Sequence, residues 1–234
     1  NLLLEMSFLA IFLAPWKWKS SLESTSKINI VAIWLLRLLL LKLIFSSGVV
    51  KLASNGPTWS GFTALQYHFF TQPLPTFFGW WMHQLPEVVL QIATFFALAI
   101  EIVVPLLIIT TRRMRQWVGL LIAALMVLIG LTGNYGFFNL LTLLLCIVLL
   151  DDRGIKKMLS WLPVKLKVKL RKSVSTEKVA TEPVSTFKSY LLYAYVGVYL
   201  VISVTQFMNI AGVNNWLPSW SDTAVSSIQS FRTI

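Results

Sequence analysis

The sequence predicts an all-α fold: a polytopic integral membrane bundle of helices with an aromatic-rich, non-cytoplasmic cap loop. First, 56% of the 234 residues are hydrophobic and 12% are charged, whereas a soluble domain has about 25% charged residues. Second, the mean hydropathy is +0.73, and several apolar runs reach the roughly 20 residues that cross a hydrocarbon core of about 30 Å. Third, these runs are continuous, whereas a β-barrel shows alternating segments.

The net charge of +11 is concentrated in the segments between the apolar runs, where basic residues set membrane orientation. Residues 16–29, 110–115 and 151–188 carry the positive excess and are therefore predicted to be cytoplasmic. The cap, the turn around Asn134 and the C-terminal tail carry almost none and are predicted to face the other side. Because the basic residues serve topology, no nucleic-acid partner is expected.

The apolar runs are assigned in chain order. Residues 1–14 are too short for a span and are expected to be the end of a helix whose start is missing. Residues 137–150 are also short, and they either cross the bilayer or form a re-entrant hairpin with the preceding helix. Full spans are predicted at residues 30–53, 88–109, 116–133 and 187–213.

Two polar segments flank the last predicted span. Residues 153–186 form a basic cytoplasmic linker, and residues 151–188 contain ten Lys and Arg against four Asp and Glu. Lysines alternate with apolar residues in residues 161–170, which suits a strand, but beside a membrane we expect a surface segment attracted to anionic lipid. Membrane lipids are therefore predicted partners. Residues 214–234 are predicted to be a non-cytoplasmic tail.

Residues 55–87 form the predicted cap. They contain both histidines and several tryptophans, and their prolines and glycines interrupt any long helix. Burial of so many aromatic rings favours an ordered structure. The aromatic side chains either bind an apolar client or form an interfacial aromatic belt, and the interleaved polar side chains favour the first alternative. The candidate client-binding residues here are Tyr67, His68, Thr71, Gln72, Pro73, Trp80, Trp81 and His83.

The turn at residues 132–139 (TGNYGFFN) is predicted to lie on the same side as the cap. Its asparagines would either bond to the cap backbone and complete a shared surface, or simply cap a helical hairpin. The candidate client-binding residues in this turn are Asn134, Tyr135, Phe137, Phe138 and Asn139.

Arg37, Lys42 and Lys51 lie inside the predicted span at residues 30–53 and Glu101 inside the span at residues 88–109, where an unpaired charge is costly. Counted from the outer face at about 1.5 Å per residue, Arg37, Glu101 and Lys42 lie at depths of about 24, 20 and 16 Å. Glu101 is therefore predicted to pair with Arg37 or Lys42. The pair is either a polar site, such as a proton path, or a structural lock between two helices with the remaining cation reaching toward water.

No catalytic residue, metal site or cofactor is predicted. His68 and His83 have only Glu87 as an anionic companion in the cap, whereas a metal site needs three or four ligands. The single cysteine, Cys146, lies in an apolar run, and CxxC, HExxH, GxGxxG and Walker motifs are absent from the sequence.

Many short motifs resemble the lipase maturation factor family, in order and with the expected spacing. They are residues 47–52 (SGVVKL), 57–59 (PTW), 67–68 (YH), 71–75 (TQPLP), 83–86 (HQLP), 101–105 (EIVVP), 112–113 (RR), 131–142 (LTGNYGFFNLLT) and 151–152 (DD). The resemblance covers residues 1–152, which are expected to form the transmembrane core. It implies a truncated chain that lacks the family's large soluble C-terminal domain.

The resemblance further implies a multi-pass protein of the endoplasmic reticulum membrane in animals, or of the inner membrane in bacteria. There it would act as a non-enzymatic maturation factor for secreted lipases or similar clients. The family is also distantly similar to vitamin K-dependent carboxylases. The alternative is therefore a membrane-embedded enzyme or lipid-handling protein with a buried polar site. That site would draw on Glu101, Lys42, Lys51 or His68. A transporter ranks third, since no repeat or broken-helix pair is evident.

Overall fold

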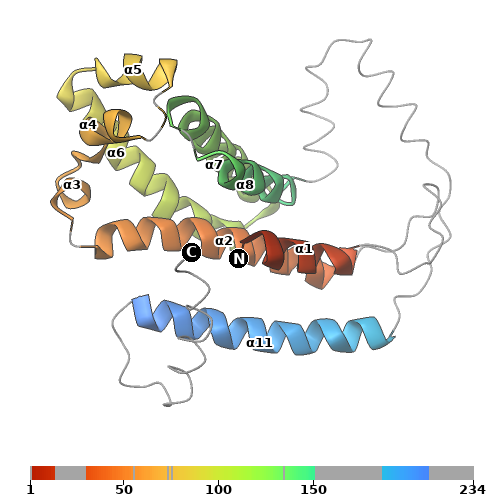
Figure 1. The fold of residues 1–234 in the computed structure, drawn as a ribbon. Helices are drawn as coiled ribbons and strands as arrows, with labels where there is room; N and C mark the ends of the chain where they lie inside the picture. The colour runs from red at the N-terminus through yellow and green to blue at the C-terminus, as the bar shows by residue number, and fades with distance from the viewer. Residues whose placement is uncertain are drawn as a thin grey trace, which may run out of the picture.

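The protein is helical throughout the part described by the computed structural model. This part comprises residues 2–13, 30–54, 56–72, 74, 76–133, 135–150 and 186–210, and it contains no strand. Figure 1 shows the arrangement. In chain order the elements are α1 (Leu2–Leu13), α2 (Ile30–Ala53), α3 (Pro57–Ser60), α4 (Ala64–Thr71), α5 (Phe77–His83), α6 (Glu87–Ile102), the 3-10 helix η1 (Val104–Ile109), α7 (Arg112–Thr132), α8 (Phe137–Ile147) and α11 (Thr186–Ile210).

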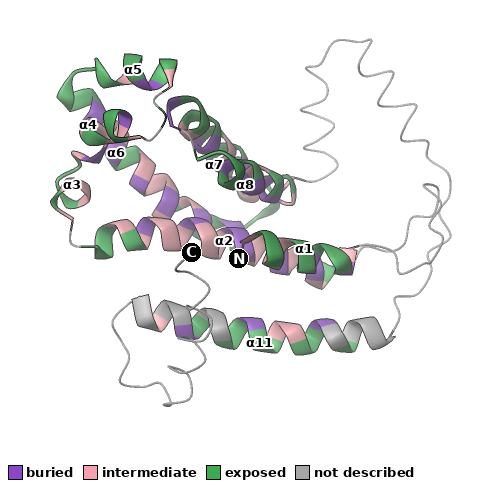
Figure 2. Ribbon diagram, in the orientation of Figure 1, coloured by how far each residue is buried: buried purple, intermediate pink, exposed green. Residues whose placement is uncertain are grey.

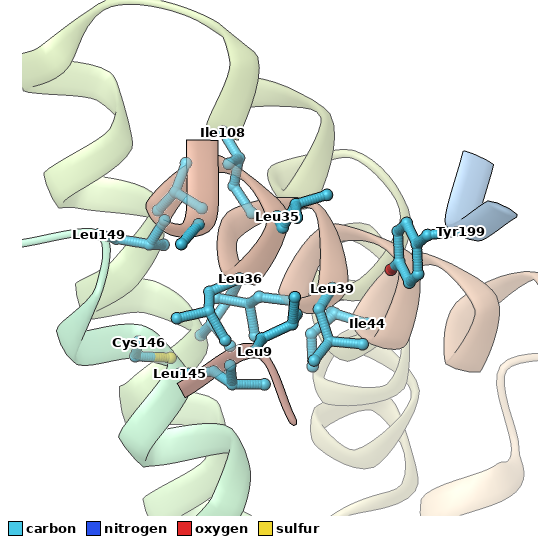
Figure 3. Packing of buried hydrophobic residues seen from close by; sticks show 14 of the residues in the cluster. Leu9, Leu35, Leu36, Leu39, Ile44, Ile108, Leu145, Cys146, Leu149 and Tyr199 are labelled. Atoms are coloured by element: carbon cyan, nitrogen blue, oxygen red, sulfur yellow. The ribbon is translucent and has the colours of Figure 1, made fainter. Parts of the chain in front are cut away.

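Helix α2 is the centre of the bundle, and α1, α6, η1, α8 and α11 all pack against it. Its buried side chains recur every three or four residues, which places them on one face of the helix. Figure 3 shows Leu36 and Leu39 of α2 close to Leu9 of α1 and Leu145 of α8, and Leu35 of α2 beside Ile108 of η1. This apolar cluster forms the hydrophobic core that holds the helices of the bundle together.

Three helical segments are long and apolar enough to cross a membrane: Ile30–Ala53, Glu87–Ile109 and Arg112–Thr132. At most 33% of each is buried within the protein. Large apolar side chains such as Ile92, Phe96 and Leu128 remain more than half exposed. Figure 2 shows exposed positions, in green, along α7. Such a surface belongs in lipid rather than water, so the predicted polytopic membrane fold is confirmed.

The second of these segments changes its helix type near its C-terminal end, which is the end that the basic residues predict to be cytoplasmic. Helix α6 ends at Ile102, and the chain continues as the 3-10 helix η1. Pro105 explains the change because it cannot donate a backbone hydrogen bond and its ring crowds the preceding turn. The third segment begins at Arg112, four residues earlier than the predicted span at residues 116–133.

Helices α7 and α8 form an antiparallel hairpin. At one end Gly130 faces the amide of Asn139, and at the other Gly119 lies against Leu149. The turn between the helices uses Gly136 with φ 47°, a left-handed conformation that glycine adopts without a Cβ clash. Helix α8 has 11 residues, which correspond to about 16 Å.

Helix α11 lies where the last span is predicted, and it packs along α2. The ammonium of Lys42 sits 5.2 Å from the ring centroid of Tyr199, and Tyr195 contacts Phe8 of α1 at 4.8 Å between ring centroids. That α11 is the last transmembrane helix stays a prediction. The predicted linker up to residue 185, and the tail at residues 214–234, lie outside the described residues.

Candidate functional site

The cap is ordered as three short helices at the end of the bundle where α2 finishes and α6 begins (Figure 1). Pro57 starts α3, where its missing N–H costs no hydrogen bond. Thr76 caps α5, since its hydroxyl accepts a hydrogen bond from the Gly79 N–H at 3.0 Å. Between α3 and α4, Phe62 adopts φ 55° and its ring meets Phe95 of α6. Each helix is attached separately to the membrane bundle.

Helix α3 lies beside an ion pair that joins α2 to α6. Lys51 Nζ of α2 is 2.5 Å from both carboxylate oxygens of Glu101 on α6. The Lys51 ammonium also lies 4.8 Å from the ring centroid of Trp59 on α3. Glu101 is 3% exposed, so its charge is neutralised within the protein.

This pairing corrects the prediction that Glu101 pairs with Arg37 or Lys42. The depth count assumed that α2 and α6 are parallel to the bilayer normal and begin level at the outer face. In the structure α6 is inclined to α2 (Figure 1), and the two helices meet at Gly48. A Cβ on Gly48 would lie 3.1 Å from the Glu101 Cβ. Lys51 is one turn beyond Gly48 and is therefore the cation within reach of Glu101.

Helix α4 is attached to α6 at its N-terminal end. The residue that precedes it, Thr63, makes no side-chain cap. Instead, the Leu65 N–H donates to the hydroxyl of Thr94, at 3.4 Å, and that hydroxyl donates to the Leu90 carbonyl at 2.8 Å. Thr94 is fully buried. The hydroxyl thus satisfies one of the amide groups that a helix start leaves without a partner.

The other end of α4 rests on the α7–α8 turn. His68 stacks on Tyr135 with ring centroids 6.0 Å apart and planes within 6°. Gln72 Nε2 lies 3.3 Å from His68 Nδ1, and a neutral imidazole with its proton on Nε2 accepts a hydrogen bond from this amide. Burial first, and the charge of Lys51 second, lower the pKa of His68. The ring is therefore held neutral at the cap–turn contact.

Helix α5 packs on the C-terminal end of α7. The Thr76 hydroxyl donates to the Leu131 carbonyl at 2.7 Å. A Cβ on Gly79 would lie 2.6 Å from the Thr132 carbonyl oxygen, so only glycine permits this approach. The opposite side of α5 is open, as Figure 2 shows.

An aromatic surface covers that open side. Trp80 and Trp81 are 58% and 56% exposed, with edge-to-face rings 5.1 Å apart. Phe77 contacts Trp81 at 6.3 Å between centroids. No Asp, Glu, Lys or Arg occurs between Lys51 and Glu87. We call the exposed rings of Phe77, Phe78, Trp80 and Trp81 the aromatic surface.

The structure brings some of the predicted client-binding residues together and separates others. His68, Gln72 and Tyr135 meet directly, and Phe137 and Phe138 of the same turn are exposed. Tyr67 contacts Phe70, which also contacts His83. Thr71 donates its hydroxyl proton to the Tyr67 carbonyl within α4. Pro73 and Asn134 lie outside the described residues.

Asn139 does not belong to the surface, contrary to the prediction. It is 6% exposed and points into the α7–α8 interface, where its Nδ2 has no hydrogen-bond partner. The reason is its position three residues after Gly136, on the face of α8 that packs toward α7. The prediction was that Asn139 would bond to the cap backbone or cap the hairpin, but the face of α8 on which it lies turns it toward α7.

The predicted site residues did not include Trp59, Thr76, Gly79 and Thr94, which help to hold the cap in place. Lys51 was named only for the alternative, a buried polar site, and not as the partner of Glu101. Two signals in the sequence point to them. Thr76 precedes a short apolar segment in the position of a helix cap, and Gly48 precedes Lys51 by one turn on a face where two helices come close.

The ionisable side chains nearest the cap are engaged by other side chains. Lys51 and Glu101 satisfy each other, and His68 is engaged by an amide and a phenol ring. Within the described residues, no group of three or more His, Cys, Asp and Glu side chains is placed to hold a metal ion. What the cap offers to a partner is uncharged aromatic surface.

Fold and site together define a multi-pass α-helical membrane protein with a helical cap held against one end of its bundle. Residues 1–157 match the family model of the lipase maturation factor transmembrane domain. The chain therefore belongs to the lipase maturation factor family.

Individual relatives agree with this assignment. The chain is 50% identical to lipase maturation factor 2 of Xenopus laevis over 163 residues, which are 66% of this chain and 22% of that protein. It is 43% identical to the human lipase maturation factor 2, over 65% of this chain and 23% of that protein. It is 29% identical to lipase maturation factor 1 of Mus musculus, over 65% of this chain and 26% of that protein. The chain thus spans about a quarter of the length of these relatives. No solved structure matches it.

Proposed function

We propose that this chain is the membrane-embedded part of a factor that assists the maturation of secreted lipases, and that the cap contributes directly to client contact. The family membership and the names of the relatives support the first part. In animal cells the setting would be the endoplasmic reticulum membrane, with the cap on the lumenal side, as the distribution of basic residues predicts.

The aromatic surface carries the second part of the proposal. Four large rings on one seven-residue helix stay exposed because the other side of α5 is occupied by α7. Folding intermediates expose apolar surface that a chaperone can shield. A rigidly held, uncharged set of rings suits this task, since little side-chain entropy is lost when it binds.

The role we propose is non-enzymatic. The alternative, a membrane enzyme, requires ionisable groups available to a substrate, and in the structure Lys51 and Glu101 engage each other. Lipids of the outer leaflet compete with a client for the same rings, since Trp and Tyr also favour the bilayer interface. An experiment must therefore separate client contact from membrane anchoring.

The test uses cells that lack the full-length protein and are complemented with variants of it. Trp80→Ala with Trp81→Ala should lower secreted lipase activity per unit of lipase mass several-fold. The matched control is Ile92→Ala with Phe96→Ala, which removes two large apolar side chains of similar exposure from the outward-facing side of α6. Normal specific activity from the tryptophan variant at normal protein level would refute a client role for the cap. An equal loss in both variants would point to membrane anchoring instead.

A further inference from the structure

We infer that a binding site for the phosphate of an anionic phospholipid lies where α2, α7 and α8 meet, at the end of the bundle opposite the cap. The site is formed by Arg37 of α2 and Arg115 of α7, whose guanidinium groups both lie near the ring of Trp34. It is separate from the cap and independent of the function proposed for it.

Two guanidinium groups from different helices converge on one indole ring. The Arg37 Cζ lies 5.0 Å from the ring centroid of Trp34, and the Arg115 Cζ lies 5.6 Å from the same centroid. Arg37 also donates from Nε to the Val148 carbonyl at 3.3 Å, which brings the C-terminal end of α8 to the same level. The two guanidinium groups carry like charges and repel each other. An anion between them would turn this repulsion into attraction.

The protein leaves these groups without sufficient acceptors. Arg115 Nε is buried and has no hydrogen-bond partner, a state that costs free energy in a folded protein. Within the described residues, the ion pair between Lys51 and Glu101 lies near the other end of α2. Neither Arg37 nor Arg115 contacts a carboxylate there. The arrangement is complete only with an external acceptor.

Phosphate is the acceptor that suits this geometry. A guanidinium presents parallel N–H groups that match two oxygens of a phosphate. The start of α7 adds the positive end of its dipole, and Thr111 supplies no side-chain cap there. A soluble anion and a lipid headgroup share this chemistry, and the position of the site distinguishes them.

The site lies toward the end of the bundle opposite the cap and opens toward lipid. Arg37 and Arg115 are both only partly buried, and the neighbouring Trp117 and Met114 on α7 are 64% and 51% exposed. Tryptophans mark the membrane–water interface, and Trp34 and Trp117 flank the cluster. Basic clusters between transmembrane helices on the cytoplasmic side hold lipid headgroups in this manner. The basic segment at residues 110–115 assigns this end to the cytoplasm.

Native mass spectrometry of the purified chain, released from detergent and titrated with phosphatidic acid, tests the site. The wild type should retain phosphatidic acid in preference to phosphatidylcholine, and Arg115→Gln should lower the apparent affinity at least fivefold. Arg115→Gln removes no hydrogen bond within the described structure, so folding should be preserved. The double variant R37Q/R115Q should lower the affinity further, and its helical content by circular dichroism should match the wild type.

Lys42→Gln is the matched control, because it removes one positive charge from the same helix as Arg37 but contacts α11 instead. Its affinity for phosphatidic acid should stay within twofold of the wild type. Equal losses in the Lys42 and Arg115 variants would overturn the inference in favour of a general charge effect. Unchanged affinity in R37Q/R115Q would also overturn it. Competition by glycerol 3-phosphate at matched concentration would assign the site to a soluble phosphate rather than to a lipid.

Discussion

Lys51 and Glu101 connect α2 to α6 beneath the cap, and their pairing gives a first prediction. Lys51→Met leaves a buried carboxylate without its cation, and removal of one partner of a buried pair costs about 3 kcal/mol. The double variant K51M/E101L should be less destabilised than K51M alone, because no charge then remains buried. Unfolding in a denaturing detergent series measures both effects. If the losses of unfolding free energy in K51M and E101L simply add up to the loss in K51M/E101L, the ion pair does not couple the helices.

His68 gives a prediction about pH. Burial and then the Lys51 charge lower the pKa of His68, so the docked cap binds a proton less readily than the undocked chain does. The contribution of His68 to the stability of the docked cap is therefore fully present above the ordinary pKa of about 6.5. This contribution is lost as the pH falls through the lowered pKa. A protonated ring would also lose its acceptor role toward Gln72.

The corresponding measurement is the thermal midpoint of the cap, followed by tryptophan fluorescence at pH 7.5 and pH 5.5. The acid-induced drop should be larger in the wild type than in His68→Gln, which keeps a polar side chain but does not titrate. All other titrating groups are the same in both proteins. Identical drops would show that His68 contributes nothing to the pH dependence.

At the scale of residues, the sequence predicts chemical type better than position. Tryptophans and phenylalanines of the cap were expected at a surface, and Trp80 and Trp81 are exposed. Asn139 was expected there too, but its place on α8 buries it. Lys51 was not considered as the partner of Glu101, because a one-dimensional depth scale contains no information on how steeply two helices cross.

At the scale of elements, the close approach of α5 to α7 depends on Gly79. Gly79→Ala would place a methyl group against the Thr132 carbonyl, and overpacking of this kind costs about 2 kcal/mol. The cap should then detach, with higher hydrogen-exchange rates in α5 than in α2. The control is Gly197→Ala in α11, where a Cβ would meet nothing within 4 Å. That variant should be neutral or slightly more stable, since alanine favours helix by about 1 kcal/mol. Slow exchange in α5 of the Gly79 variant would contradict the docking described here.

The helices themselves follow well from the sequence, because apolar length is a strong signal in a membrane protein. The predicted span at residues 30–53 and α2 share their bounds. The start of α7 was placed too late, since Arg112, Arg113 and Arg115 were assigned to a loop by charge alone. In fact a basic first turn is tolerated at an interface, where water and headgroups solvate the side chains.

At the scale of the whole molecule, the topology of the α7–α8 hairpin gives a further prediction. Leu149 lies beside Gly119, and Val148 is bonded to Arg37, so the end of α8 is close to the level at which α7 begins. We therefore expect a full crossing rather than a re-entrant hairpin. A cysteine at position 134, in a Cys146→Ser background, should react with a membrane-impermeant reagent from the non-cytoplasmic side. Reaction from the cytoplasmic side would reverse the topology, and no reaction from either side would favour a re-entrant hairpin.

The bond from Thr76 to the Leu131 carbonyl joins residues 55 positions apart, and this separation has a consequence for synthesis on the ribosome. Helix α5 leaves the ribosome well before its docking partner exists. At 5–20 residues per second the interval is about 3 to 11 s. During that time the aromatic rings of α5 have no folded neighbour on either side, so a nascent chain stalled before residue 131 should be captured by the cell's own chaperones.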